Sequence, residues 1–302
     1  FSMSPAASVS TAALASVPGA SQGPAPSAQV RKAEDVSLAF YVLTFNQPQQ
    51  LALLIDSWQQ QPELFKRSTV YVLDNSTEPE ALAENARLCE AQGLQHLPQG
   101  NLGICGGRQR AAELFEASAH DYMVFLEDDM LLSRPAMPPC RSGFVTWVDR
   151  LDQRLIEIME KERFDFLKLS FTEVYGANHE QWAWYNVPAA VRSQVWPDQT
   201  DLPVSGLAQR IPPVVFERIG TEGGLAYAMG QVYYSNWPQI VGREGNRRMF
   251  LETRWARPYE QTWMSHLFQE TRAGRLRPAV LLASPIDHRR EFHYRAEERV
   301  ES

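Results

Sequence analysis

Residues 121–132 read DYMVFLEDDMLL, and this stretch decides the fold. Four apolar residues, 123–126, run directly into three consecutive acidic residues, Glu127, Asp128 and Asp129. A continuous apolar run of this kind is typical of a strand that is buried on both faces of a parallel sheet. Adjacent carboxylates repel one another unless a cation or protonation relieves the repulsion. We therefore expect an acidic site at the end of a buried strand.

Strands and helices alternate in the sequence that precedes this strand. Further strands are predicted at 38–45, 69–76 and 94–97, and helices at 49–61, 78–93 and 100–119. This alternation predicts an α/β fold whose central sheet is mostly parallel and carries helices on both faces. In such sheets, ligands bind beyond the carboxyl ends of the strands.

Polar residues gather at this edge of the predicted sheet. Thr44 and Asn46 follow the first strand, Asp74 ends the second, and the acidic run 127–129 ends the fourth. Carboxylate oxygens suit Mg²⁺ or Mn²⁺, which often bridge protein carboxylates to substrate phosphates. Two simpler interpretations stay open, because the acidic run could be a solvated turn and the segment 74–76 could be a turn and helix cap.

Composition limits the class of protein. The chain has 302 residues, 44% of them hydrophobic, which is enough for a sizeable core. A net charge of -7 offers no basic footprint for nucleic acid, and we find no apolar run near the roughly 20 residues that span a bilayer. The three cysteines, Cys89, Cys105 and Cys140, lack zinc-type spacing. We expect reduced structural thiols in a soluble, cytoplasmic protein without a membrane span.

Residues 1–35 are rich in Ala, Ser, Pro and Gly, with no charge before Arg31. Such a segment cannot build a core, so we predict a disordered leader. A secretory signal is the competing interpretation, but the basic residues that begin such signals are missing.

The run 101–132 resembles GT-A-fold, family-two-like glycosyltransferases, in which an Asn-x-Gly loop and a small-Arg-Asn helix start precede an Asp-x-Asp-type metal motif. The residues that match are Asn101, Gly103, Gly107 and Arg108. Gln109 stands where the family usually has Asn, and Glu127 replaces the first Asp. The predicted strands at 38–45 and 69–76 also look like the first two strands of the family, so the resemblance covers roughly residues 38–132.

The resemblance implies a nucleotide-diphospho-sugar transferase fold. It also implies a metal-dependent glycosyltransferase that moves a sugar from a nucleoside diphosphate donor, a UDP-sugar, to an acceptor hydroxyl with inversion. The cofactor would be Mn²⁺ or Mg²⁺. By resemblance, Thr44, Asn46 and Asp74 would line the nucleotide pocket, Arg108 would approach the nucleotide or its diphosphate, Asp128 would lie near the ribose, and Glu127 and Asp129 would face the metal.

We assign residues 36–135 to the donor-binding half and 136–302 to an acceptor-binding half of the same compact domain. A helix is predicted at 140–164 and a strand over FDFLKLSF, residues 164–171. The second half also contains an aromatic insertion with Trp182, Trp184, Tyr185 and Trp196, and a C-terminal tail. These rings suit an acceptor cleft or a lid, and ordinary packing is an equally open interpretation. A glycan, a protein or a small molecule could be the acceptor.

Two late residues complete the predicted site. Glu260 falls in the first turn of a helix that begins near Pro258, and the resemblance makes it the base that deprotonates the acceptor. His288 would be an additional metal ligand by the same resemblance. A helix-start glutamate and a surface histidine are the simpler alternatives. The arginines near the C-terminus could pair with the diphosphate or with neighbouring glutamates; they are Arg289, Arg290 and Arg295.

Two other classes of function remain open. A nucleotidyltransferase could use the same sheet and cation, but the glycine-rich loop expected after its first strand is replaced by LTFNQPQQ. A non-catalytic nucleotide-sugar-binding protein with a degenerate GT-A fold is suggested by Gln109 and Gln261.

Overall fold

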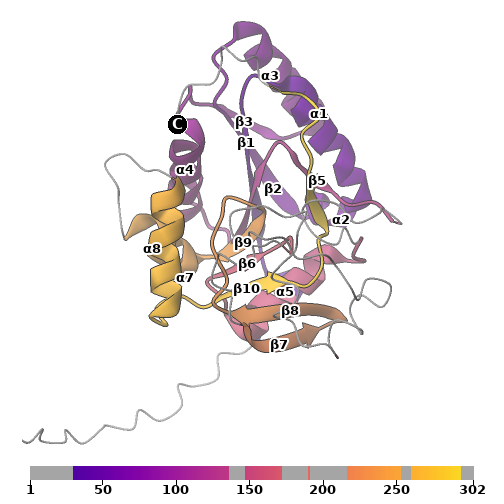
Figure 1. The fold of residues 1–302 in the computed structure, drawn as a ribbon. Helices are drawn as coiled ribbons and strands as arrows, with labels where there is room; N and C mark the ends of the chain where they lie inside the picture. Colours follow the sequence, from indigo (N-terminus) through magenta and orange to yellow (C-terminus); the bar gives the residue numbers. More distant parts are fainter. Residues whose placement is uncertain (1–29, 136–146, 172–189, 191–215, 253–259, 294–302) are drawn as a thin grey trace, which may run out of the picture. The chain divides into compact units, whose positions relative to one another are not determined.

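The computed structural model describes residues 30–135, 147–171, 190, 216–252 and 260–293 (Figure 1). Residues from Arg31 onward form one compact unit. Most of the predicted leader, the aromatic insertion, Cys140 and Arg295 lie outside the described residues. In the part that is described, no helix is long and apolar enough to cross a membrane.

The described residues 30–135 contain five strands, four helices and two 3-10 turns. In order they are η1 (Ala33–Asp35), β1 (Leu38–Thr44), α1 (Pro48–Ser57), η2 (Trp58–Gln60), α2 (Pro62–Lys66), β2 (Ser68–Asp74), α3 (Pro79–Gln92), β3 (Gln95–Pro98), α4 (Gly103–Ala117), β4 (Tyr122–Glu127) and β5 (Met130–Leu132). The described elements that follow are α5 (Leu151–Glu162), β6 (Phe166–Lys168), β7 (Phe216–Glu222), β8 (Leu225–Gly230), β9 (Gln239–Gly242), α7 (Arg243–Asn246), the π-helical η5 (Arg247–Leu251), α8 (Glu260–Arg272), β10 (Pro278–Leu281) and β11 (Ile286–His288).

The central sheet has nine described strands in the order β3-β2-β1-β4-β9-β6-β10-β8-β7. β1 pairs in parallel with both β2 and β4, which places Thr44 beside Asp74 and Leu43 beside Glu127. β9 and β8 run against their neighbours, and the other strands share one direction. The predicted mostly parallel sheet is therefore confirmed, and the polar ends of β1, β2 and β4 lie at one edge.

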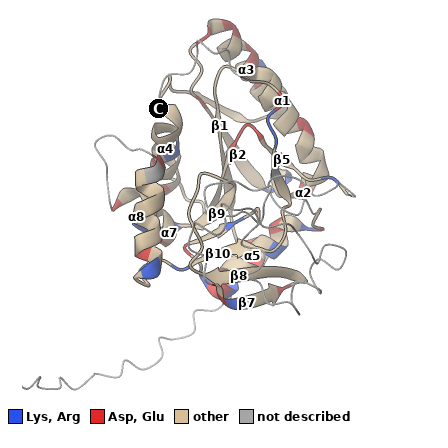
Figure 2. Cartoon of the chain, viewed as in Figure 1, with Lys and Arg blue, Asp and Glu red and all other residues tan. Residues whose placement is uncertain are grey.

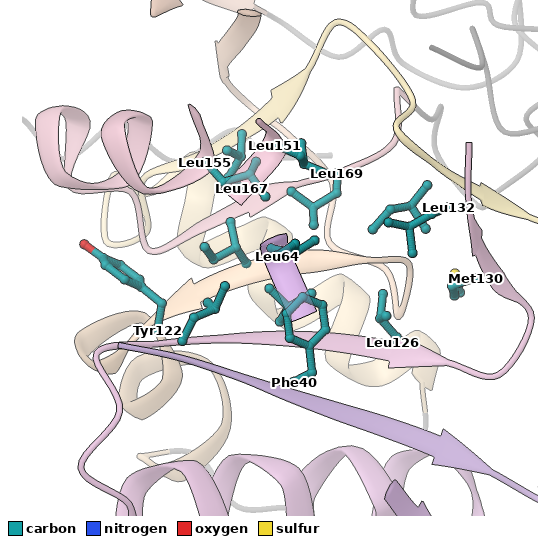
Figure 3. Close-up of a cluster of buried hydrophobic side chains, with 14 of the residues drawn as sticks. Phe40, Leu64, Tyr122, Leu126, Met130, Leu132, Leu151, Leu155, Leu167 and Leu169 are labelled. Atoms are coloured by element: carbon teal, nitrogen blue, oxygen red, sulfur yellow. The ribbon is translucent and has the colours of Figure 1, made fainter. Parts of the chain in front are cut away.

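The alternating side chains of β1 enter two separate cores. Leu38, Phe40 and Val42 pack into the core that contains residues of α1, α3 and α5, part of which is drawn in Figure 3. Ala39, Tyr41 and Leu43 pack into the core that contains residues of α4 and α8. Burial of each large apolar side chain stabilises the fold by about 1.5–3 kcal/mol. The two cores show that helices cover both faces of the sheet, as predicted.

Local signals account for several helix boundaries. Pro48, Pro62 and Pro79 lie in the first turns of α1, α2 and α3, where a missing N–H costs nothing. Gly93 ends α3 with a φ of 67°, a conformation that glycine adopts without strain. Acidic and basic residues both occur along α3 and α8 (Figure 2), and some form short-range pairs such as Arg87 with Glu84.

Two segments differ from the sequence prediction. Within the described part of the helix predicted at 140–164, residues 147–150 are not helical and α5 begins at Leu151, because Arg150 has a φ of 51° and breaks the helical path; residues 140–146 lie outside the described residues. Residues 31–35 fall inside the predicted leader, yet Arg31 lies 2.6 Å from Asp121 and 2.7 Å from Glu160 in two ion pairs. These pairs hold the start of the compact unit to α5 and to the residue that precedes β4.

Gly245 in α7 packs directly against the main chain of Asp165. A methyl group at Gly245 would lie 2.0 Å from the Asp165 carbonyl oxygen, so the backbone must shift to accept one. We expect Gly245→Ala to lower the free energy of unfolding by about 1–3 kcal/mol. Urea unfolding measures this effect. The control is Glu244→Ala on the same helix, where the side chain is exposed and a change within about 0.5 kcal/mol is expected.

Candidate active site

The acidic run forms a tight turn at the carboxyl edge of the sheet. Glu127 ends β4, and Asp128 and Asp129 make the turn into β5; we call these three residues the carboxylate turn. β5 pairs in antiparallel fashion with β11, with Met130 opposite His288. This pairing brings the C-terminal segment 286–293 onto the turn. Asp128 and Asp129 are buried, with 1% and 3% of their surfaces exposed.

The turn carries its own counter-ion. Arg290 donates from Nη2 to Asp128 Oδ1 at 2.8 Å and from Nε to Asp129 Oδ2 at 2.9 Å. Thr44 Oγ1 donates to Asp128 Oδ2 at 2.8 Å. The predicted pairing of Arg290 with a diphosphate or with glutamates is thus replaced, in this structure, by pairing with the two aspartates. A charge-assisted fork of this kind explains how adjacent carboxylates are held at a buried edge.

The three carboxyl groups differ in their readiness to ionise. Burial, and then the charges of Asp129, Glu260 and Asp128, raise the pKa of Glu127 well above its usual range. Burial raises the pKa of Asp128 to about 7, although Arg290 opposes the shift. Burial also acts to raise the pKa of Asp129, but the hydrogen bond and charge of His288, together with Arg290, hold it below its ordinary value. Asp129 is therefore the member of the turn that stays ionised at neutral pH.

This pattern predicts a pH dependence of stability that comes from Asp128. With a pKa of about 7 in the folded protein and about 3.9 in the unfolded chain, the folded state binds this proton more tightly. The resulting stabilisation is complete below about pH 4 and is lost as the pH rises through about 7. We expect the thermal midpoint of the wild type, measured in EDTA, to fall between pH 5 and pH 8. The midpoint of Asp128→Asn should fall by several degrees less over the same range. Identical slopes for the two proteins would contradict the shift.

His288 and Asp129, two of the three predicted metal ligands, contact each other in the structure. His288 Nε2 lies 3.1 Å from Asp129 Oδ2, and its ring packs 4.7 Å from that of Trp237. Asp129 Oδ1 is buried and has no hydrogen-bond partner among the described residues, so one oxygen could serve a cation. In the described part of the chain, no three His, Cys, Asp or Glu side chains already stand at metal-ligand spacing. The donor types suit Mn²⁺ or Mg²⁺, and the ligand set Glu127, Asp129 and His288 stays a prediction.

Gln50 fixes the C-terminal segment in place and was not predicted as a site residue. Its Nε2 donates to the carbonyl oxygens of Asp128 and Arg289, at 3.2 Å each. Its Oε1 accepts from the main-chain N–H groups of Glu291 and Phe292, at 2.9 and 3.2 Å. Because all these partners are main-chain atoms far along the chain, the sequence holds no signal that separates Gln50 from other helix glutamines.

Asn46 forms hydrogen bonds to the segment that precedes α3. Its φ is 46°, and its N–H donates to Ser76 Oγ at 2.8 Å. Its Oδ1 accepts from the main-chain N–H groups of Thr77 and Glu78, at 2.9 and 3.2 Å. The amide therefore supports the entry to α3, whereas its predicted contact with a nucleotide stays a prediction.

Asp74 is also engaged inside the molecule. It is fully buried, and its carboxylate accepts from the Ser76 N–H at 2.9 Å and from Asn85 Nδ2 at 3.0 Å. His96 Nε2 lies 2.8 Å from Asp74 Oδ2. The bond to Ser76 is the turn that the simpler interpretation of 74–76 expected. The contact of Asp74 with a nucleobase stays a prediction.

Arg108 lies beneath the surface. Its exposed fraction is 0%, and its guanidinium lies 4.6 Å from the Phe125 ring and 3.8 Å from the Phe250 ring. Burial lowers its pKa, and the Tyr234 hydroxyl lies beside it. The predicted approach of Arg108 to a diphosphate gains no support from this placement, because no part of the side chain is accessible.

Glu260 lies across from the carboxylate turn. It begins α8 and accepts a hydrogen bond from the main-chain N–H of Asn236, and burial raises its pKa. Its charge acts on Glu127, Cys105 and Tyr234, so Glu260 lies within electrostatic reach of these groups. Cys105 and Tyr234 were not predicted as site residues, because an isolated thiol and an isolated tyrosine carry no sequence pattern. The role of Glu260 as the base stays a prediction.

Comparisons with known proteins bear on the fold. No family model matches the chain, and no curated protein matches it. The crystal structure of GalNAc-T7 with UDP, GalNAc and Mn²⁺ is similar, with a TM-score of 0.52 at 10% identity; the match covers 88% of this chain and 46% of that one. S. aureus TarS 1-349 in complex with UDP-GlcNAc gives a TM-score of 0.48 at 13% identity, over 85% of this chain and 60% of that one.

A further structure is glucosyl-3-phosphoglycerate synthase from Mycobacterium tuberculosis, with a TM-score of 0.44 at 14% identity, over 86% of this chain and 75% of that one. The chain spans less than two thirds of GalNAc-T7 and of TarS. The likeness to GalNAc-T7 shows that the described sheet and its helices have a GT-A-type glycosyltransferase fold, as the resemblance implied.

Proposed function

We propose that this chain is a metal-dependent glycosyltransferase that moves a sugar from a UDP-sugar to an acceptor hydroxyl with inversion. One observation carries the proposal. At the carboxyl edge of a GT-A-type sheet, the ionised Asp129 contacts His288, and the charge of the partly buried Glu260 acts on the neighbouring Glu127. UDP and Mn²⁺ are favoured because GalNAc-T7, which shares the fold, was crystallised with both.

Asp129, Glu127 and His288 are the residues that would hold Mn²⁺ or Mg²⁺. When bound, the cation would offset the negative charge that develops on a departing diphosphate. The Thr44–Asp128 hydrogen bond would fix the carboxylate predicted to meet the ribose. The acceptor stays open among a glycan, a protein and a small molecule.

Glu260 is the proposed base. A carboxyl group whose pKa is raised by burial is closer to neutral pH and therefore takes a proton more readily. Its carboxylate would take the acceptor hydroxyl proton while the acceptor oxygen bonds to the anomeric carbon. The bond from that carbon to the diphosphate oxygen breaks at the same time, so the configuration inverts.

The thiols favour a cytoplasmic protein in this proposal. Cys89 and Cys105 are free, and burial raises the pKa of each to about 12. Thiols of this kind are unreactive and suit a reducing compartment.

The test is a panel of nucleoside diphosphate sugars, each with and without Mn²⁺, measured first by thermal shift and then by nucleoside diphosphate release. We expect a Mn²⁺-dependent shift with a UDP-sugar, followed by UDP release. A shift without release in the presence of any acceptor class would favour the non-catalytic binding protein. Formation of a nucleotide sugar from a nucleoside triphosphate and a sugar phosphate would favour the nucleotidyltransferase.

A further inference from the structure

The segment between β8 and β9, residues 231–238, contains a hydrogen-bonded pair next to the proposed base. The Tyr234 hydroxyl donates to Asn236 Oδ1 at 2.7 Å, and both residues are buried. The main-chain N–H of Asn236 donates to the Glu260 carboxylate. The position of this carboxylate therefore depends on the conformation of residues 234–236.

Aromatic packing connects the same segment to α8. The Tyr234 ring meets Phe250 edge-on at 5.8 Å and Phe166 at 6.0 Å. Phe250 in turn meets Trp263 edge-on at 5.4 Å. Because Trp263 follows Glu260 by three residues in α8, the two side chains lie on neighbouring parts of the same helix face. The first turn of α8 is thus held to Tyr234 through Phe250 as well as through Asn236.

The charge of Arg108 favours the orientation in which the Tyr234 hydroxyl donates its proton to Asn236. Asn236 Oδ1 can only accept, so the hydroxyl proton points at Asn236 and the oxygen lone pairs are left for another group. The Arg108 guanidinium lies beside this hydroxyl, and its positive charge acts on it. A buried cation next to the lone pairs stabilises the orientation in which Tyr234 donates to Asn236.

We propose that Tyr234 and Asn236 are positioning residues, which hold the Glu260 carboxylate in the orientation from which it takes the acceptor proton. The inference rests on the proposed role of Glu260. Since a displacement of about 1 Å in a reacting group can cost roughly 100-fold in rate, loss of this support should lower kcat by about 10- to 100-fold. Donor binding at the carboxylate turn should be unaffected.

The experiment uses Tyr234→Phe, which removes only the hydroxyl. We expect kcat for UDP release from UDP-GlcNAc or UDP-glucose with Mn²⁺ to fall about 10- to 100-fold, while KM for the donor stays within about twofold. Hydrogen–deuterium exchange of the amides at 260–268 should become faster. The matched control is Tyr227→Phe, because Tyr227 is equally buried and its hydroxyl donates to Glu162 at 2.8 Å, on the side of the sheet that carries α5. It should leave both measurements unchanged.

A second variant, Asn236→Ala, keeps the main-chain N–H but removes the acceptor of the Tyr234 hydroxyl. It should reproduce both the fall in kcat and the faster amide exchange. If Tyr234→Phe fails to fold, Asn236→Ala tests the inference in its place. Wild-type kcat and exchange in the two variants would overturn the inference. If the two variants behave like wild type while Glu260→Gln is inactive in the same assay, only the positioning inference fails and the proposed function stands. Full turnover by Glu260→Gln, or no UDP release by the wild-type chain, would overturn the inference together with the proposed function of Glu260.

Discussion

Replacement of Asp129 by alanine should abolish Mn²⁺-dependent sugar transfer, with a loss of about 1,000-fold or more in the rate of UDP release. Asp129 is the member of the carboxylate turn whose pKa lies below its ordinary value, so it offers a full negative charge to a cation at neutral pH. It also contacts His288 and retains one buried oxygen that has no hydrogen-bond partner in the part of the chain that the structure describes. The metal-dependent part of the thermal shift with UDP should disappear as well.

This variant needs a check on folding, because Asp129→Ala also removes a partner of Arg290. Asp129→Asn keeps the size of the side chain and should show the same loss of metal dependence. Asp149→Ala is the control, since Asp149 is a carboxylate with 60% of its side chain exposed outside the site. Unchanged UDP release by a folded Asp129→Ala protein would remove Asp129 from the mechanism.

Replacement of Glu260 by glutamine should lower kcat by about 100- to 10,000-fold, the range that general base catalysis contributes. The amide keeps the shape of the side chain and can still accept from the Asn236 N–H, but it cannot take a proton. Since Glu260 is not expected to hold the metal, the thermal shift with Mn²⁺ and UDP should remain. UDP release and thermal shift, measured on the same preparation, separate the two effects.

The control for this variant lies on the same helix. Glu270 is in the last part of α8 and pairs with Arg275 at 2.6 Å at the surface, so Glu270→Gln should keep wild-type turnover. If Glu260→Gln turned over at the wild-type rate, Glu260 would be only a helix-start residue. If it lost the thermal shift and turnover together, its role would be to support donor binding.

Much of the sheet could be predicted from the sequence, because its signals are local. Apolar runs of strand length marked β1, β2 and β4, and Gly93 marked the end of α3. The edge at which Thr44 and the carboxylate turn meet followed from the parallel order of the strands alone. The start of α5 was missed because the left-handed backbone of Arg150 has no marker in its residue type.

The contacts that complete the site could not be predicted. Arg290 pairs with Asp128 and Asp129 across 162 and 161 residues, and only the antiparallel pairing of β5 with β11 brings them together. The local alternative for residues 74–76 accounts for the bond from Ser76 to Asp74, whereas the contacts of Asp74 with Asn85 and His96 and those of Asn46 with Ser76 and Thr77 depend on the tertiary fold. Arg108 stands on the helix where the pattern placed it, but the pattern gave no sign that two aromatic rings would enclose it.

The most direct test of the central claim is a crystal structure of the full chain grown with UDP and Mn²⁺, with the metal located by its anomalous scattering. We expect one Mn²⁺ peak in direct contact with Asp129 and with the UDP diphosphate, and His288 turned to the same ion. A diphosphate bound away from residues 127–129, or a manganese peak without contact to Asp129, would contradict the claim.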